Sequence, residues 1–511
     1  MCSIAGITNR NSTKEVFTML QSMFHRAPDD LGMFNDENIS MGMGRLSIID
    51  LKSKNLCPFK NEKIILSFNG EIYNYKEIRN ELKKAGYKFK TSSDTEVLGN
   101  AWDKWGKKLF TKIKGMFVFA IYEKKTKKLF IARDIPGEKP LYYLRKNNNL
   151  YFASEAKALK KILNLKKIKS DFFETFQHCS DQTLWKDVYQ LPAAHYIEYN
   201  LTSKKFSIIE YWKIKKKKIN QKTAQEELEY LLKKSINLCT QADVDYGLYY
   251  SKGVDSTLLT TFHSFKNKFY FNDKSNYEKD FRKTIKKIAY HLDFPVGSFS
   301  SYPLWKLAER AKKNNVKVIL SGEGADEIFT GYARYMPIYM QWKLNKRYPS
   351  YEYLMSKFYN SYHEGYAKLT SRNDENLDLI KKTMKNYFEM FDNPVDAMCY
   401  FDFKVIMPSL LQMGDRMSAA FGVENRCPFL DRDIIEFGFN LDVEQKINFE
   451  QQKLILRNIL KKRLNSKYSE IEKKGLTIKF NNWFKVKSWD RSKYFQFLFK
   501  NWRSVYNVKS Y

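Results

Sequence analysis

The pattern of hydrophobic residues changes near residue 210, and this change most constrains how the chain can fold. Before that point, short hydrophobic runs separated by turn residues predict strands, and amphipathic stretches predict helices. The predicted strands are Ile64–Phe68, Met116–Tyr122, Leu129–Ala132 and Leu141–Leu144, and the predicted helices are Tyr75–Ala85 and Thr95–Trp105. Residues 1–210 therefore predict an α+β domain with a sizeable sheet.

The second half, residues 211–511, predicts a different class of domain. It begins with a lysine-rich segment, Lys213–Lys218, which is typical of a solvated linker. Beyond the linker, long helical stretches surround two apolar strands, Tyr246–Tyr250 and Val316–Leu320. Each strand runs into a loop of small residues and then a helix, a pattern that predicts a parallel α/β sheet.

Composition excludes several classes of protein. The 511 residues suffice for two or three domains, and a hydrophobic content of 43% excludes a mainly disordered chain. The net charge is +32, but the basic residues are mostly lysines spread along the chain, without an arginine-led cluster or a recognised binding motif. A nucleic-acid partner is therefore not expected.

Cysteine spacing and hydropathy favour a cytoplasmic protein without a zinc site. The six cysteines lie far apart and form no CxxC pair, which is typical of a reducing compartment. The longest apolar runs, such as residues 115–122, are far below the roughly 18 residues of a membrane span. The sequence has neither an HExxH motif nor a Cys/His ligand spacing.

The amino terminus carries a candidate nucleophile. Removal of Met1 would leave Cys2 with a free α-amine beside its own thiol. An α-amine with a pKa of about 7.7–8.0 is a usable general base for that thiol at neutral pH. A cysteine at position 2 can also be incidental, so this residue needs the support of its neighbours.

Three further motifs accompany Cys2: Arg45–Asp50 (RLSIID), Asn69–Asn74 (NGEIYN) and Ser93–Glu96 (SDTE). In this order they resemble the glutaminase domain of class II, N-terminal-nucleophile glutamine amidotransferases, within the asparagine synthetase family. The resemblance implies an Ntn-hydrolase-like αββα sandwich. One departure is Ala27, which stands in His25–Asp29 where the family pattern His-Arg-Gly-Pro-Asp has glycine.

The resemblance assigns roles to these residues. Cys2 would attack the glutamine amide, and the Asn69 side-chain amide and the Gly70 N–H would form the oxyanion hole. Arg45 would hold the glutamine carboxylate, and Asp94, with Glu71 in the same site, its ammonium. The alternatives are a hairpin turn at Asn69-Gly70 and a surface ion pair between Arg45 and Asp94.

A second group of motifs follows the strand Tyr246–Tyr250. Residues Ser251–Ser256 (SKGVDS) resemble the pyrophosphate-binding loop of ATP pyrophosphatases, Ser-Gly-Gly-x-Asp-Ser. Such a loop binds phosphate through backbone N–H groups at a helix N-terminus. Lys252 stands where that pattern has its first glycine. If this position needs a positive φ, lysine costs roughly 1–2 kcal/mol, but it could also add a phosphate contact. An ordinary strand-to-helix turn is the alternative.

Later motifs complete the resemblance: Leu320–Glu327 (LSGEGADE), Asp415–Ser418, Val423–Asp431 and Lys473–Leu476. By resemblance, Glu323 is a catalytic acid/base for amination, and Asp255 and Asp326 hold Mg²⁺. The implied ATP and pyrophosphate ligands are Ser251, Gly253, Asp255, Ser256, Ser321, Gly322, Asp326 and Lys473. The alternative for the charged residues is a structural salt-bridge network.

The stretch between Ser251 and Ser321 is several tens of residues shorter than the corresponding stretch of the family. The missing part lies between 270 and 295. Its loss could reduce the sheet or change acceptor binding.

The implied function is a glutamine-hydrolysing asparagine synthetase, a ligase. Ammonia released at Cys2 would pass through a tunnel to aspartate activated by Mg·ATP, giving asparagine, glutamate, AMP and pyrophosphate. The family also implies a homodimer. Two alternatives stay open: amidation of another carboxylate, such as a sugar acid or a peptide side chain, and a degenerate synthetase that keeps only glutaminase or binding activity.

Overall fold

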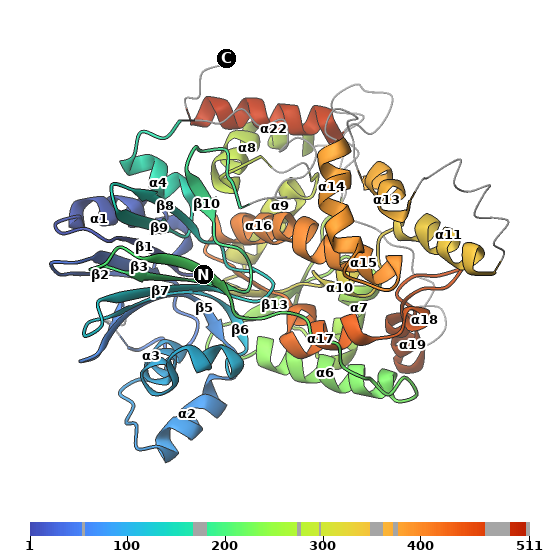
Figure 1. The fold of residues 1–511 in the computed structure, drawn as a ribbon, viewed down its shortest axis with the longest axis horizontal. Coiled ribbons are helices and arrows are strands. Elements are labelled where there is room, and N and C mark those ends of the chain that lie inside the picture. Colours follow the sequence, from blue (N-terminus) through green and yellow to red (C-terminus); the bar gives the residue numbers. More distant parts are fainter. Residues whose placement is uncertain are drawn as a thin grey trace.

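The computed structural model describes residues 1–53, 57–166, 181–272, 277–295, 298–347, 361–370, 377–464 and 491–506. Its N-terminal half contains two antiparallel sheets (Figure 1). The first has the order β10-β8-β9-β1-β3-β2. Its strands are β1 (Ser3–Ile7), β2 (Asp30–Asn35), β3 (Ser40–Arg45), β8 (Tyr142–Lys146), β9 (Asn149–Ala153) and β10 (Val188–Gln190).

The second sheet has the order β12-β11-β7-β6-β5-β4. Its strands are β4 (Phe59–Lys60), β5 (Ile64–Ile72), β6 (Gly115–Glu123), β7 (Lys128–Arg133), β11 (His195–Asn200) and β12 (Phe206–Glu210). Side chains alternate between the faces of a strand, so one face of each sheet can enter a shared core. Met41 and Met43 of the first sheet pack in one core with Val118 and Ile131 of the second.

Helices cover the outer face of each sheet. On the first sheet lie α1 (Thr13–Ser22) and α4 (Ala156–Ile162), and on the second α2 (Tyr75–Lys84) and α3 (Asp94–Trp105). Helix α3 begins at Ser93, whose hydroxyl accepts a hydrogen bond from the Thr95 N–H, as expected for an N-cap. The half is therefore an αββα sandwich, as the family resemblance implied.

The C-terminal half is built on a four-stranded parallel sheet of order β14-β13-β15-β16. The strands are β13 (Tyr246–Tyr249), β14 (Asn267–Phe269), β15 (Val318–Leu320) and β16 (Glu424–Arg426). Leu248 and Leu320 face α6 (Ala224–Cys239), α7 (Val254–Phe262) and α19 (Leu454–Arg463). Tyr249 and Ile319 face α8 (Tyr277–Leu292), α9 (Ser301–Lys313) and α16 (Met407–Ala419). The predicted α/β class is confirmed.

The remaining helices lie away from the sandwich or along its edge (Figure 1). They are α10 (Ala325–Ile328), α11 (Tyr335–Arg347), α13 (Tyr362–Thr370), α14 (Leu377–Phe388), α15 (Pro394–Phe401), α17 (Arg432–Asn440), α18 (Val443–Lys446) and α22 (Arg491–Val505). None of the described helices is long and apolar enough to cross a membrane. The five cysteines among the described residues form no disulfide.

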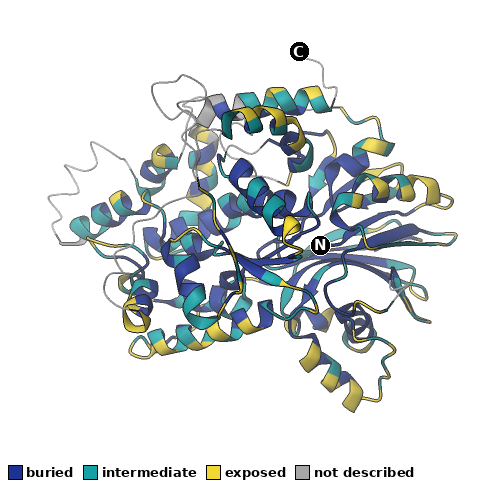
Figure 2. Cartoon of the chain, turned by 180° about the vertical axis from the view of Figure 1, so that it is seen from behind, coloured by how far each residue is buried: buried dark blue, intermediate teal, exposed yellow. Residues whose placement is uncertain are grey.

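The two halves meet over a buried surface in the middle of the molecule (Figure 2). The N-terminus lies at this junction, and Met1 is completely buried. Three arginines are also completely buried: Arg26, Arg416 and Arg426. Arg26 donates to Asp415 at 2.8 Å, and Arg416 pairs with Glu155 at 3.2 Å, so charged groups cross the junction. Buried charges are tolerated only when paired, so these contacts fix how the halves dock.

Candidate active site

Strands β1 and β5 place the candidate nucleophile beside the predicted oxyanion hole. The Cys2 N–H donates to Asn69 Oδ1 at 3.0 Å. Burial is the main cause that raises the pKa of the Cys2 thiol and lowers that of the Met1 amine. The Met1 amine lies 3.5 Å from the Glu424 carboxylate of the C-terminal half. While Met1 is present, the nitrogen of Cys2 belongs to a peptide bond and cannot act as a base.

Asn69 and Gly70 lie inside β5, where they pair with Val118 and Phe117 of β6, so the hairpin-turn alternative is wrong. Gly70 has φ 152°, and a Cβ there would lie 2.1 Å from the Met116 carbonyl oxygen, so only glycine fits. Among the described residues, the buried Asn69 Nδ2 has no hydrogen-bond partner. An unpaired buried donor is costly in a ligand-free protein but is what an oxyanion hole requires.

Arg45 and Asp94 line one pocket with Cys2 and Glu71. Both are 6% exposed, so the surface ion-pair alternative is wrong. Arg45 instead donates to the carbonyl oxygens of residues 49, 50 and 53 at 2.8–2.9 Å and so holds the loop that follows β3. Its guanidinium remains a lining group of the pocket.

Two carboxylates form the acidic end of this pocket. Asp94 accepts a hydrogen bond from the Ile72 N–H at 3.0 Å. Burial raises the pKa of both Asp94 and Glu71, and the neighbouring Asp94 raises that of Glu71 further. Arg426 Nη2 lies 3.1 Å from Glu71 Oε2 and opposes this shift. Paired carboxylates of this kind favour an ammonium ligand.

The departure at Ala27 does not strain the loop. Ala27 has φ −140° and ψ 66°, so glycine's conformational freedom is not needed. The preceding Arg26 donates to the Cys2 carbonyl oxygen at 3.3 Å and to Asp415. The loop therefore reaches both the nucleophile and the C-terminal half with alanine in place.

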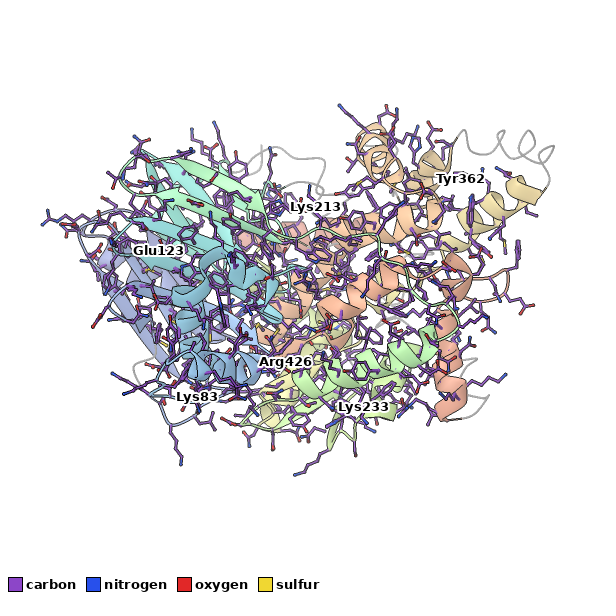
Figure 3. All side chains as sticks on the ribbon, turned by 60° about the horizontal axis from the view of Figure 1, so that its bottom comes forward. Lys83, Glu123, Lys213, Lys233, Tyr362 and Arg426 are labelled. Carbon is purple, nitrogen blue, oxygen red and sulfur yellow. The ribbon has the colours of Figure 1, made fainter. Side chains whose placement is uncertain are left out.

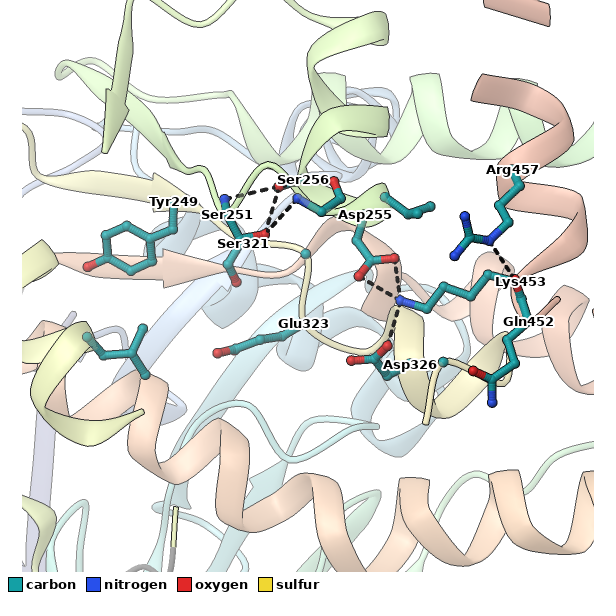
Figure 4. A pocket seen from close by; sticks show the side chains of 15 residues that line it. Tyr249, Ser251, Asp255, Ser256, Ser321, Glu323, Asp326, Gln452, Lys453 and Arg457 are labelled. Atoms are coloured by element: carbon teal, nitrogen blue, oxygen red, sulfur yellow. Dashed lines mark hydrogen bonds and ion pairs between the residues drawn. The ribbon is translucent and has the colours of Figure 1, made fainter. Parts of the chain in front are cut away.

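The candidate nucleotide site lies at the carboxyl ends of β13 and β15. A cavity of about 200 Å³ opens there (Figure 4). Seven of the eight predicted ATP-binding residues line it together with Glu323: Ser251, Gly253, Asp255, Ser256, Ser321, Gly322 and Asp326. The eighth, Lys473, lies outside the described residues. Ligands of parallel α/β folds bind at this edge of the sheet.

The loop between β13 and α7 is held by its two serines. Ser251 Oγ and Ser256 Oγ lie 3.1 Å apart, and the Gly253 N–H donates to Ser251 Oγ at 3.2 Å. Lys252 adopts φ 62°, the left-handed conformation in which a side chain is strained. Its side chain is exposed, and its Nζ lies 5.7 Å from the centre of the Tyr270 ring.

Lys453 is a cavity residue that the sequence analysis missed. Its Nζ lies 2.6 Å from Asp255 Oδ1 and 2.5 Å from Asp326 Oδ1 (Figure 4). Burial disfavours the ammonium, but the two carboxylates outweigh it and raise the pKa of Lys453. No motif distinguishes this lysine from the many others in the chain, and only the fold brings it to the cavity.

Asp255 and Asp326 also fit the chemistry of a magnesium site. Their oxygens converge on one cationic group, and carboxylate oxygens are ligands that Mg²⁺ prefers. Within the described ranges, no cluster of three or more His, Cys, Asp or Glu side chains could hold a metal ion. A magnesium ion here would therefore share its coordination with substrate phosphates.

Glu323 is a titratable group of the cavity that contacts a residue of β16. Its Oε2 accepts hydrogen bonds from Asn425 Nδ2 at 3.1 Å and from Cys427 Sγ at 3.5 Å. Burial raises the pKa of Glu323 to about 7, although these two hydrogen bonds oppose the shift. A carboxyl with such a pKa can exchange a proton near neutral pH.

Comparison with known proteins identifies the two halves. The glutamine amidotransferase domain matches residues 1–212, and the asparagine synthase family matches residues 274–496. Asparagine synthetase [glutamine-hydrolyzing] 1 of Bacillus subtilis is 29% identical, over 96% of this chain and 89% of its own. A Methanocaldococcus jannaschii protein with the same family name is 30% identical, over 66% of this chain and 76% of its own. The chain therefore belongs to the glutamine-hydrolysing asparagine synthetase family and is an amidotransferase ligase.

Proposed function

We propose that this enzyme makes asparagine, with glutamine as the nitrogen donor and aspartate activated by ATP as the acceptor. The observation that carries the proposal is the position of β16 between two sites. Glu424 lines the pocket of Cys2, while Asn425 hydrogen-bonds Glu323 in the nucleotide cavity. A nucleophile site and a nucleotide site that share one strand suit a donor reaction coupled to an acceptor reaction.

The donor reaction uses the N-terminal half. After Met1 is removed, the Cys2 α-amine takes the thiol proton, and the thiolate attacks the side-chain amide carbon of glutamine. Asn69 Nδ2 and the Gly70 N–H stabilise the resulting oxyanion. The α-amine returns its proton to the leaving nitrogen, ammonia departs, and water hydrolyses the thioester to glutamate. Arg45 holds the glutamine carboxylate, and Glu71 and Asp94 hold its ammonium.

The acceptor reaction uses the cavity of the C-terminal half. Backbone N–H groups and the hydroxyls of Ser251 and Ser256 hold the ATP phosphates at the start of α7. The aspartate β-carboxylate displaces pyrophosphate from the α-phosphorus. Ammonia then attacks the acyl carbon, Glu323 accepts a proton from the attacking nitrogen, and AMP leaves. Asparagine is the product.

Magnesium, held by Asp255 and Asp326 when bound with ATP, would supply charge neutralisation at the phosphates. Lys453 provides a permanent positive charge between the same carboxylates. Lys453 therefore bridges the two carboxylates and favours their ionised forms before the nucleotide arrives.

The test is one incubation with glutamine, aspartate and Mg·ATP, using protein whose N-terminus is confirmed to be Cys2. Glutamate, asparagine, AMP and pyrophosphate are quantified together. Equal amounts of asparagine, AMP and pyrophosphate are expected. Glutamate without AMP would overturn the aspartate assignment.

The short segment between β14 and β15 favours a second candidate, amidation of another carboxylate. Only α8 and α9 lie there among the described residues, and the sheet has four strands. A cavity enclosed by fewer helices and strands would leave room for an acceptor larger than aspartate. AMP formation with a sugar acid or a peptide carboxylate, and none with aspartate, would favour this candidate.

A further inference from the structure

Arg426 is a side chain of the C-terminal half that reaches the glutamine pocket of the N-terminal half. It lies at the end of β16, is completely buried and sits where the two halves meet (Figure 3). Its Nη1 donates to the carbonyl oxygens of Cys239 and Gln241 at 2.9 and 2.8 Å, and its Nε to Glu424 Oε1 at 3.0 Å. These contacts all come from the C-terminal half and fix the direction of the guanidinium.

The remaining Arg426 nitrogen, Nη2, lies 3.1 Å from Glu71 Oε2. Glu71 lies in β5, next to Gly70, and lines the pocket with Asp94 and Glu424. Glu71 is 4% exposed, so solvent does little to screen its charge. Burial and two further carboxylates nearby raise the pKa of Glu71 and so disfavour its ionised form, whereas Arg426 favours that form.

We propose that Arg426 positions Glu71 in the subsite for the glutamine ammonium, so that glutamine binding depends on the docked C-terminal half. This inference rests on the proposed function, because it assumes that Glu71 and Asp94 receive glutamine. Arg426 does not touch the substrate and acts through Glu71. It is therefore a positioning residue rather than a catalytic one.

Loss of Arg426 should therefore affect the binding of glutamine but not the chemical step of its hydrolysis. Without the guanidinium, Glu71 Oε2 loses the donor that lies 3.1 Å away and holds it in place, and a displaced carboxyl attracts an ammonium poorly. Among the described residues, the hydrogen bonds of Arg426 go to Glu424, Cys239, Gln241 and Glu71 rather than to Cys2, Asn69 or Gly70, so the reaction of bound glutamine continues. The KM for glutamine should rise, while kcat for glutamine hydrolysis should change little.

The test is Arg426→Lys, which keeps the charge but loses the planar fork. We expect the KM for glutamine to rise about 10-fold, the ratio that corresponds to one charge-assisted hydrogen bond. The matched control is Arg416→Lys, because Arg416 is equally buried and also pairs across the junction, with Glu155. Its KM for glutamine should stay within about twofold of the wild-type value.

Labelling of Cys2 provides a second readout. Half-saturation by 6-diazo-5-oxo-L-norleucine, which carries the same α-ammonium as glutamine, should shift with KM in Arg426→Lys. Alkylation of Cys2 by iodoacetamide, which lacks an ammonium, should keep its rate. An equal loss with both reagents would mean a general disturbance of the site and would overturn the inference.

Loss of a buried charge can also prevent folding, so a double-mutant cycle completes the test. Glu71→Gln/Arg426→Gln removes both charges and leaves no carboxylate of this pair unpaired. If Arg426 acts through Glu71, the double variant should have the same KM as Glu71→Gln alone. A further rise in KM would overturn the inference. Wild-type protein that releases no glutamate would instead overturn the proposed function.

Discussion

Glu424 and Asn425 are neighbours on β16, yet they contact different sites. Glu424 lines the pocket of Cys2, whereas Asn425 donates a hydrogen bond to Glu323 at 3.1 Å. Successive side chains of a strand point to opposite faces, so this division follows from strand geometry. A displacement of β16 would therefore move Glu424 in the Cys2 pocket and Asn425 beside Glu323.

Replacement of the nucleophile should separate the two reactions. Cys2→Ala removes the thiol and should lower glutamine-dependent synthesis by at least about 10³-fold. Synthesis from ammonium salts should persist, because the nucleotide cavity is unchanged. The measurement is AMP formation with each nitrogen donor. Equal loss with both donors would contradict the assignment of Cys2 to glutamine alone.

Asn69→Ala tests the oxyanion hole. Asn69 Nδ2 is a buried donor without a partner among the described residues, while Oδ1 accepts a hydrogen bond from the Cys2 N–H at 3.0 Å, so the variant removes an oxyanion donor and a contact to the nucleophile. We expect kcat for glutamine hydrolysis to fall about 10²–10³-fold. The KM for glutamine should change far less, since the donor serves the transition state. A rise in KM with normal kcat would show that Asn69 binds ground-state glutamine instead.

The raised pKa of Glu323 should make activity and stability depend on pH in opposite directions. Because burial raises its pKa to about 7, ammonia-dependent synthesis that needs the ionised carboxylate, compared at a fixed concentration of free ammonia, should increase up to about pH 7 and then level off. The folded state binds the Glu323 proton more tightly than the unfolded state does. The resulting stability is full below about pH 4.5 and is lost as the pH rises through 7.

The variant Glu323→Gln should abolish synthesis and make the unfolding free energy less dependent on pH between 4.5 and 7. Glu327, whose pKa burial also raises to about 7, remains in the variant and leaves part of the slope. Urea denaturation at several pH values measures the difference. An unchanged slope would contradict the raised pKa of Glu323.

Lys453→Met leaves Asp255 and Asp326 facing each other without the ammonium. We expect a loss of stability of about 3–5 kcal/mol and loss of ATP-dependent activity, with normal glutamine hydrolysis. Added Mg²⁺ should recover part of the melting temperature, because a divalent cation can bridge the two carboxylates. Lys446→Met, which removes a buried lysine paired with Asp396, is the control and should show no recovery.

Lys252→Gly tests the strained position of the phosphate loop. Glycine accepts φ 62° without strain, so the variant should be more stable by about 0.5–1 kcal/mol, whereas Lys252→Ala should not. The lysine side chain is exposed near Tyr270, and the KM for ATP should stay within about twofold. A larger rise in the KM for ATP would show that Lys252 contacts phosphate.

The sequence by itself determined the two classes of domain and predicted most of the residues that line the two pockets. Short apolar runs separated by turns before residue 210 predict an α+β domain, and strand–loop–helix units after it predict a parallel sheet, because these patterns decide which faces can be buried. The αββα sandwich followed only from the family resemblance. Short motifs predicted Cys2, Asn69 and Asp255, because loops and strand ends bring residues near in sequence together.

Only the tertiary structure decided which distant residues share a site. Lys453 lies between Asp255 and Asp326, and Arg426 reaches Glu71 across the junction of the halves. Lys453 lies in no motif, and the motif that contains Arg426 does not reveal its partner, since these partners of the two residues lie between 127 and 355 positions away. Docking of the two halves and closure of the sheet create these contacts, and a buried charge finds its partner only once the chain has folded.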